Sequence, residues 1–206
     1  MPELTAFALN CSLKPSTAEA PSSTDRLLGE ILAALAKHGA TGEIVRAADY
    51  DIRPGVQSDE GPGDAWPGLR AKVLAADVFI LGTPIWLGQP SSIAKRVVER
   101  MDAFLSETDD RSRMPAFGKV AAVAVVGNED GAHHVHAEMF QALSDVGFTI
   151  PANGGAYWVG EAMQSTNYVD LDETPEKVAQ TVEMLAANAV HLARLLKRET
   201  YPGVAG

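Results

Sequence analysis

Short apolar segments alternate with amphipathic ones along this chain, and this alternation constrains the fold more than any other feature of the sequence. After each apolar segment, apolar residues recur at helical spacing, which predicts a helix. Strands that are apolar along their whole length are typical of a parallel sheet covered by helices on both faces. The sequence therefore predicts an α/β fold. The predicted strands are 4–9, 43–47, 77–81, 120–126 and 148–150.

Five such strand–helix units favour a doubly wound, five-stranded parallel sheet of the flavodoxin type, with strand order 2-1-3-4-5. A TIM barrel needs eight units and about 250 residues, and this chain has 206. The Gly- and Pro-rich segment 51–67 is a predicted loop that is too short to separate two domains, and 153–173 is predicted to be irregular. We therefore expect residues 1–206 to form a single domain.

Capping residues mark where the predicted helices begin and end. The hydroxyl residues at 22–24 are candidate N-caps for a helix that ends before Gly39. Thr174 followed by Pro175 opens the last helix, as an N-cap before proline at the first helical position. The remaining predicted helices are 69–75, 91–104 and 132–146.

Charge and cysteine content argue against several classes of protein. The formal net charge of −10 argues against a general nucleic-acid binder, which needs a basic surface to replace phosphate counterions. Cys11 is the single cysteine, so neither an internal disulfide nor a cysteine-based metal centre is expected. No apolar run approaches the roughly 20 residues that span a bilayer, and no signal peptide is recognised at the start. We expect a cytoplasmic protein without a membrane partner.

Open α/β sheets bind ligands at the carboxyl ends of their strands, at the point where the strand order reverses. In the predicted order this point lies between the first and third strands. The loops that matter there are 10–24, 82–90 and 127–131. A ligand site should therefore be built from these three loops.

The first of these loops is rich in hydroxyl groups and runs directly into the N-terminus of a helix. Free N–H groups and partial positive charge at such an N-terminus suit a phosphate. Two interpretations are open: the polar residues bind a phosphate, or they only cap the helix and fill a loop. The residues concerned are Ser12, Lys14, Ser22, Ser23 and Thr24.

The second loop is apolar and the third is rich in glycine. Residues 84–87 form a surface that either packs against the protein or is presented to a planar heteroaromatic ligand, and Gly88 lets the backbone approach a ligand. In the third loop, Gly127 and Gly131 permit positive φ angles, so that N–H groups can converge on a ligand. A plain turn explains the third loop nearly as well.

Other phosphate-binding families are disfavoured by the residues at this edge. The P-loop motif and the Rossmann glycine motif are absent after the first strand. A low-molecular-weight tyrosine phosphatase needs an arginine where Thr17 stands, because that arginine binds the phosphate in a bidentate way. A response-regulator receiver needs acidic residues where Asn10 and Thr83 stand.

Two segments, taken in order, match a known pattern. One is Asn10-Cys-Ser-Leu-Lys-Pro15 leading to Ser22-Ser-Thr-Asp-Arg-Leu27, and the other is Gly82-Thr-Pro-Ile-Trp-Leu-Gly-Gln-Pro-Ser-Ser-Ile-Ala-Lys95. Over about residues 4–146 the chain resembles flavodoxin-like NADPH-dependent FMN reductases and the NAD(P)H:quinone oxidoreductases. These proteins typically have Gly-Ser-x-Arg, then Asn-Thr or Ser-Thr before the helix, then Thr-Pro-x-Tyr before a Ser-x-x-Leu-Lys helix.

The resemblance implies an FMN site and departs from the family in four places. Asn10-Cys11 stands where the family usually has a glycine or another small residue. Lys14 replaces the usual arginine, and Trp86 replaces the usual tyrosine. Residues 15–21 form an insertion. By resemblance, the phosphate would be held by Ser12, Ser23 and Thr24, with Lys14 nearby and Ser22 in the same loop. The isoalloxazine would be flanked by Pro84, Ile85, Trp86, Leu87 and Gly88, and bordered by Gly127, Asn128, Glu129 and Gly131.

The activity implied by the resemblance is that of an FMN-dependent oxidoreductase. It would take a hydride from NADPH or NADH and pass electrons to a quinone, free flavin or another small acceptor, and relatives are often homodimers or homotetramers. Because the flavin carries the redox chemistry, no catalytic side chain is expected. Two alternatives stay open: a non-enzymatic electron carrier like flavodoxin, and a redox-inactive binding protein with the same fold.

Five further residues have less specific expectations. His133, His134 and His136 are expected on a solvated helix face or at the mouth of the pocket rather than around a metal, so no metal site is predicted. Tyr157 and Trp158 are expected either to pack over the site or to lie in the core or a dimer contact.

Overall fold

The computed structural model describes residues 3–204, in which a parallel sheet separates two layers of helices. The sheet has the order β2-β1-β3-β5-β6. Counted along the chain, these parallel strands follow the order 2-1-3-4-5, so the predicted flavodoxin-like topology is confirmed. The strands are β1 (Leu4–Asn10), β2 (Ala40–Arg46), β3 (Val78–Trp86), β5 (Val120–Val126) and β6 (Gly155–Trp158).

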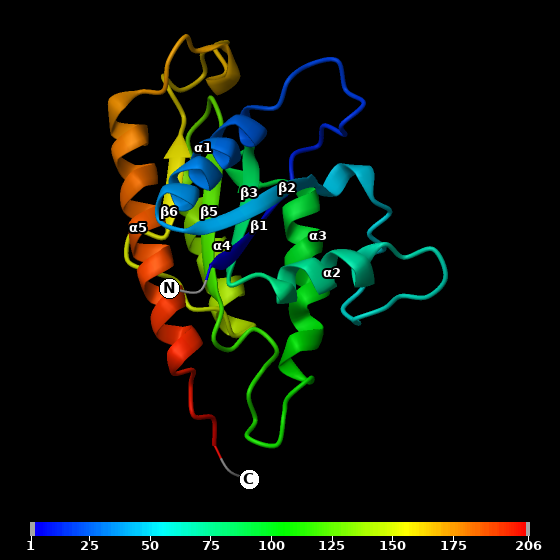
Figure 1. The fold of residues 1–206 in the computed structure, drawn as a ribbon. Coiled ribbons are helices and arrows are strands. Elements are labelled where there is room, and N and C mark those ends of the chain that lie inside the picture. Colours follow the sequence, from blue (N-terminus) through cyan, green and yellow to red (C-terminus); the bar gives the residue numbers. More distant parts are fainter. Residues whose placement is uncertain (1–2, 205–206) are drawn as a thin grey trace.

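Helices cover both faces of the sheet (Figure 1). On one face lie α1 (Ser23–Lys37) and α5 (Glu176–Arg198); on the other lie α2 (Trp66–Ala75), α3 (Ser92–Arg100) and α4 (Ala132–Asp145). Short 3-10 turns are η1 (Ala47–Asp49), η2 (Met101–Leu105) and η3 (Tyr168–Asp170). Within residues 3–204, no helix is both long and apolar enough to cross a membrane.

The sheet is apolar on both faces because both faces are buried. In β1, Phe7 and Leu9 pack under α2, α3 and α4, whereas Ala6 and Ala8 pack under α1 and α5. In β5 every residue is buried. Two-sided burial removes the apolar–polar alternation of a half-exposed strand, which is why these segments are continuous apolar runs.

The third strand is longer than predicted. The prediction that a loop starts at Gly82 is wrong, because β3 continues to Trp86 and turns back into β4 (Gln89–Pro90). Leu87 (φ 53°) and Gly88 (φ 74°) form the two-residue turn between them. Two positive φ angles are typical of a tight hairpin, so the apolar residues of the predicted loop lie on a hairpin instead.

The last parallel strand lies later in the chain than predicted. Residues 148–150 contribute only an isolated bridge between Thr149 and Val120, and Phe148 is buried as a core residue after α4. The strand that completes the sheet is β6, which pairs with β5. The segment 153–173, predicted to be irregular, therefore contains both β6 and η3.

The two predicted N-caps have different outcomes. Ser22 caps α1, since its hydroxyl accepts a hydrogen bond from the Asp25 N–H at 3.2 Å. Thr174 does not cap the last helix. Its hydroxyl donates to the Glu30 carboxylate at 2.6 Å, and Pro175 occupies the cap position without a side-chain bond.

One ion pair is completely buried and anchors the long loop before α2. Arg100 and Asp64 side chains are both fully shielded from solvent and meet at 2.7 Å. The guanidinium also donates to the carbonyls of Arg53 and Gln57, and it holds the pKa of the Asp64 carboxyl well below its usual range. Removing one partner of such a pair leaves the other as an uncompensated buried charge.

We therefore expect Asp64→Ala to lower the free energy of unfolding by about 3–5 kcal/mol, measured by urea denaturation. Glu43→Ala is the control, because Glu43 pairs with Lys72 at the surface and such pairs contribute little. A loss for Asp64→Ala no larger than that of the control would contradict the anchoring role.

Candidate functional site

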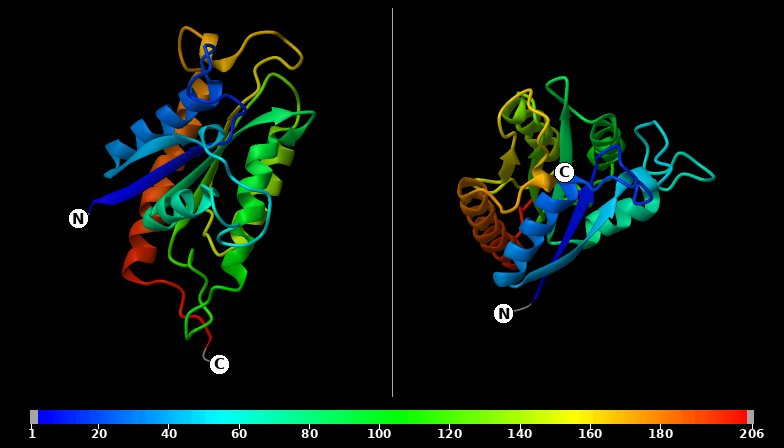
Figure 2. Two further views of the ribbon diagram at one scale, coloured as in Figure 1. Left: turned by 90° about the vertical axis from the view of Figure 1, so that its right-hand side faces the viewer. Right: turned by 90° about the horizontal axis from the view of Figure 1, so that it is seen from above.

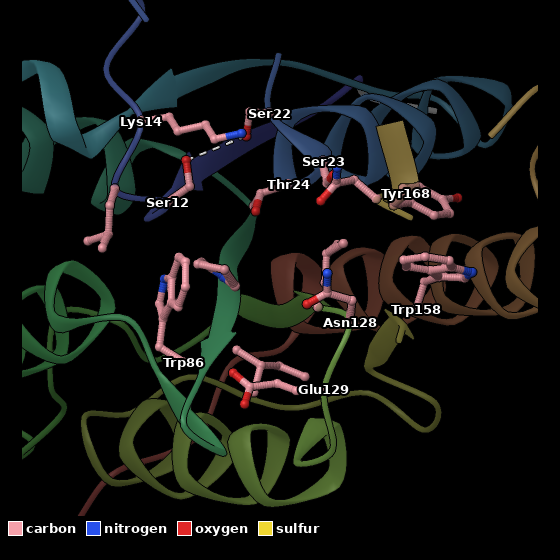
Figure 3. Close-up of a pocket in the computed structure, with 16 residues that line it drawn as sticks. Ser12, Lys14, Ser22, Ser23, Thr24, Trp86, Asn128, Glu129, Trp158 and Tyr168 are labelled. Atoms are coloured by element: carbon pink, nitrogen blue, oxygen red, sulfur yellow. Dashed lines mark hydrogen bonds between the residues drawn. The ribbon is translucent and has the colours of Figure 1, made fainter. Parts of the chain in front are cut away.

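A pocket opens at the carboxyl edge of the sheet, where the loops after β1, β3 and β5 meet (Figure 3). Its space, counted out to the open side, is about 710 Å³. It lies at the predicted switch point between the first and third strands of the chain. It is lined by Ser12, Leu13, Lys14, Ser22, Ser23, Thr24, Pro84, Ile85, Trp86, Val126, Gly127, Asn128, Glu129, Trp158, Asn167 and Tyr168.

Most of the residues predicted to bind a cofactor line this pocket. Leu87, Gly88 and Gly131 do not. The two glycines serve a close approach, because a Cβ on Gly131 would lie 2.9 Å from the Gly88 Cα. Leu87 is 91% exposed at the tip of the hairpin. These three residues therefore shape the hairpin tip and the turn beside the pocket.

Buried hydroxyl groups gather where α1 begins. Ser22 and Ser12 are 4% and 6% exposed, and their Oγ atoms lie 3.4 Å apart. Within residues 3–204, no group accepts a hydrogen bond from the main-chain N–H of Ser23 or Thr24. The positive end of the helix dipole and these free donors favour an anion.

Lys14 is the cation among the lining residues, and it lies near Ser12 and Ser22 (Figure 3). Its ammonium donates to the Pro21 carbonyl at 3.0 Å. This bond closes the predicted insertion 15–21 onto the start of α1. Two of its three N–H donors are left for other acceptors.

The opposite wall comes from the β3–β4 hairpin and the turn after β5. Trp86 is 54% exposed on this wall, whereas Ile85 is buried beneath it. A Cβ on Gly127 would lie 3.0 Å from Ile85, so glycine lets the turn pack against the hairpin. The Glu129 carboxylate accepts a hydrogen bond from the Leu87 N–H at 2.8 Å. The wall is thus fixed by contacts between two separate segments.

The far end of the pocket was not predicted, apart from the interpretation that Trp158 packs over the site. Figure 3 shows Trp158 and Tyr168 at the end away from Trp86, and their rings lie 5.3 Å apart. Arg26 holds this end against α1, since its guanidinium donates to the carbonyls of Tyr168 and Leu171 at 2.9 and 2.6 Å. Burial, together with the neighbouring Glu30, raises the pKa of the Tyr168 hydroxyl.

Two further titratable side chains near the pocket, Cys11 and His136, are buried. Burial raises the pKa of the Cys11 thiol, so it is not a ready nucleophile. The expectation of a fully solvated histidine face is wrong for His136, which is buried between Phe140 and Tyr157; His134 is exposed. No group of residues in the described part of the chain is arranged to hold a metal ion.

Comparison with known proteins identifies the family. The model of the NADPH-dependent FMN reductase family matches residues 5–164. The chain belongs to this family. Asn167 and Tyr168, which close the far end of the pocket, lie beyond the part that matches the FMN reductase model.

Two relatives are similar to this chain over more residues than the FMN reductase family model matches. The 8-demethyl-8-aminoriboflavin-5'-phosphate synthase of Streptomyces davaonensis is 31% identical in an alignment 208 positions long, which covers 96% of this chain and 80% of that protein. A protein of Mycobacterium bovis named divalent metal cation transporter MntH is 33% identical in an alignment 201 positions long, which covers 94% of this chain. The chain spans only 29% of that second protein's length.

One solved structure is similar over nearly the whole chain. It is RosB with the bound intermediate 8-demethyl-8-formylriboflavin-5'-phosphate, with a TM-score of 0.87 and 30% identity. The similarity covers 97% of this chain and 82% of RosB. The fold of this FMN reductase family member therefore agrees with that of a protein solved with a flavin phosphate.

The buried histidine makes the stability of the protein depend on pH. Burial lowers the pKa of His136 to about 4, below its value of about 6.5 in an unfolded chain. As pH falls from 6.5 towards 4, this histidine becomes protonated in the unfolded chain but stays neutral in the folded protein. The stability that it contributes is therefore lost over this range. We expect the wild-type free energy of unfolding to fall by up to about 3 kcal/mol relative to His136→Gln between pH 7 and 4. His134→Gln should follow the wild-type profile, and parallel profiles for all three proteins would contradict the prediction.

Proposed function

We propose that this protein binds FMN in the pocket and acts as an oxidoreductase that takes a hydride from NADPH or NADH and passes electrons to a quinone, free flavin or another small acceptor. The observation that carries the proposal is the pairing of two features in one pocket. Buried hydroxyls and free N–H groups at the start of α1 lie on one side, and the partly exposed ring of Trp86 lies on the other.

The end of the pocket beside the start of α1, called the anion end below, suits the phosphate of FMN. Ser12 and Ser22 supply hydroxyl groups, and the N-terminus of α1 supplies N–H groups at Ser23 and Thr24. Neutral donors of this kind bind a dianion without a bidentate arginine, because the helix dipole adds favourable charge. Lys14 adds one positive charge at the same end.

The apolar wall suits the ring of the flavin. Pro84, Ile85 and Trp86 present an apolar surface, and Asn128 and Glu129 border it with polar groups. Bound FMN would supply the redox chemistry. The residues of the chain orient the ring, exclude water from one of its faces and leave the pocket open on the other side for a second reactant. By resemblance to the family, we propose that the protein works as a homodimer or homotetramer.

A second candidate function treats the flavin as substrate. The Streptomyces davaonensis relative is named as a synthase of an aminated riboflavin phosphate, and RosB was solved with a formylated one. At about 30% identity these names extend to this chain only as a proposal. Both candidate functions require that the pocket binds a flavin phosphate. In the first the flavin is a cofactor whose structure is unchanged after the reaction, and in the second its ring is chemically converted.

An anaerobic titration tests the first candidate, and an aerobic incubation with FMN and an amine donor tests the second. We expect the protein, mixed with FMN and then freed of unbound flavin, to keep the flavin absorbance and to lose it on addition of NADPH or NADH without a partner protein. Recovered flavin should keep the mass of FMN. A changed flavin mass after the aerobic incubation with an amine donor would favour the second candidate. Protein that stays colourless with FMN would contradict both, and bound FMN that neither nicotinamide reduces would favour an electron carrier.

A further inference from the structure

Asn10 is buried, carries no charge and does not line the pocket, yet it contacts three residues around the anion end. It is the last residue of β1 and is 0% exposed. Its Oδ1 accepts a hydrogen bond from the Ser12 N–H at 2.8 Å. Its Nδ2 donates to the Ser22 Oγ at 3.2 Å and to the Asp25 carboxylate. Asn10 therefore connects the sheet, the first loop and the start of α1.

These partners fix the orientation of the Asn10 amide. The Ser12 N–H can only donate, and an ionised Asp25 carboxylate can only accept. Exchanging the oxygen and nitrogen of the amide would set donor against donor and acceptor against acceptor. Arg46 pairs with the same carboxylate, with its Nε 2.7 Å from Asp25 Oδ2, and neutralises it. The Asn10 amide therefore always presents its N–H to Ser22.

The hydrogen bonds of Ser22 then determine where its own proton points. The Ser22 Oγ accepts from Asn10 Nδ2 and from the Asp25 N–H, each at 3.2 Å. A hydroxyl oxygen has two lone pairs, so only its proton remains to be placed. The nearest acceptor is the Ser12 Oγ at 3.4 Å, longer than the roughly 3.0 Å limit for a good O–H···O bond. The proton of this buried hydroxyl is thus left for a ligand in the pocket.

We infer that Asn10 is a positioning residue that sets the preference of the pocket for a phosphorylated ligand, by occupying the lone pairs of Ser22 and leaving its hydroxyl as a donor. This inference rests on the proposed function, because it takes the phosphate of FMN as the anion. Without the Asn10 amide, the Ser22 Oγ keeps only the hydrogen bond from the Asp25 N–H. Its proton and its second lone pair can then exchange places, and in some orientations a lone pair faces the anion.

The comparison of FMN with riboflavin isolates the phosphate, because the two ligands differ only there. We expect Asn10→Ala to weaken FMN binding about tenfold, as for the loss of a hydrogen bond to a charged group, and to leave riboflavin binding unchanged. Ser22→Ala should have a similar effect. In a Ser22→Ala background, adding Asn10→Ala should change the preference no further, since Asn10 acts through Ser22. Flavin fluorescence titration measures all four proteins.

Asn188→Ala is the matched control. The Asn188 amide donates a hydrogen bond to the main-chain carbonyl of Ala152 at 2.8 Å, and Asn188 lies on α5 and does not line the pocket. It should leave both affinities unchanged. Should Asn10→Ala fail to fold, Asn10→Ser enters the same cycle.

Two results would overturn the inference. One is that Asn10→Ala weakens the binding of FMN and of riboflavin equally. The other is that Asn10→Ala weakens FMN binding as much in the Ser22→Ala background as it does in the wild-type protein. A second measurement distinguishes failure of the inference from failure of the proposed function: the rise in melting temperature that inorganic phosphate causes. If the wild-type protein binds neither flavin but phosphate stabilises it more than Asn10→Ala, the proposed function fails and the inference stands. Equal stabilisation of the two proteins by phosphate would overturn the inference.

Discussion

The structure of the site depends on where α1 begins. Its first residues lie at the carboxyl end of β1, and the positive end of the helix dipole faces the crevice between β1 and β3. Asn10 fixes this arrangement by bonding the end of the strand to the helix cap and to Asp25. Because the donors are held before a ligand arrives, little ordering remains to be done when an anion binds.

The other walls are attached to this point by contacts between segments that are distant in sequence. The hairpin tip is held to the turn after β5 by the Glu129–Leu87 hydrogen bond. The η3 turn is held to α1 by Arg26, whose guanidinium also lies over the ring of Tyr168. Figure 2 shows the segments after β1 and β6 at the same end of the sheet. The pocket is therefore shaped by backbone segments whose positions are mutually fixed.

The parts that could be predicted from sequence are those whose cause is local. Continuous apolar runs identified β1 and β5, and the hydroxyl residues before Leu27 identified the start of α1. Glycine and proline after Leu81 suggested a loop, but the strand continues because Thr83 and Pro84 still pair with β5. Tyr168 lines the pocket because Arg26, which lies 142 residues earlier, donates a hydrogen bond to its main-chain carbonyl. The burial of His136 depends on Phe140 and Tyr157 packing around it. The position of Tyr168 has no signal in the neighbouring sequence, whereas Phe140 stands at helical spacing from His136 and only the contact with Tyr157 could not be foreseen.

The most direct test of the account is a crystal structure of the protein with FMN. The account predicts phosphate oxygens within about 3 Å of the hydroxyls of Ser12 and Ser22 and of the N–H groups of Ser23 and Thr24, with the ring beside Trp86. A phosphate bound elsewhere, or a crevice closed by the protein's own side chains, would contradict it.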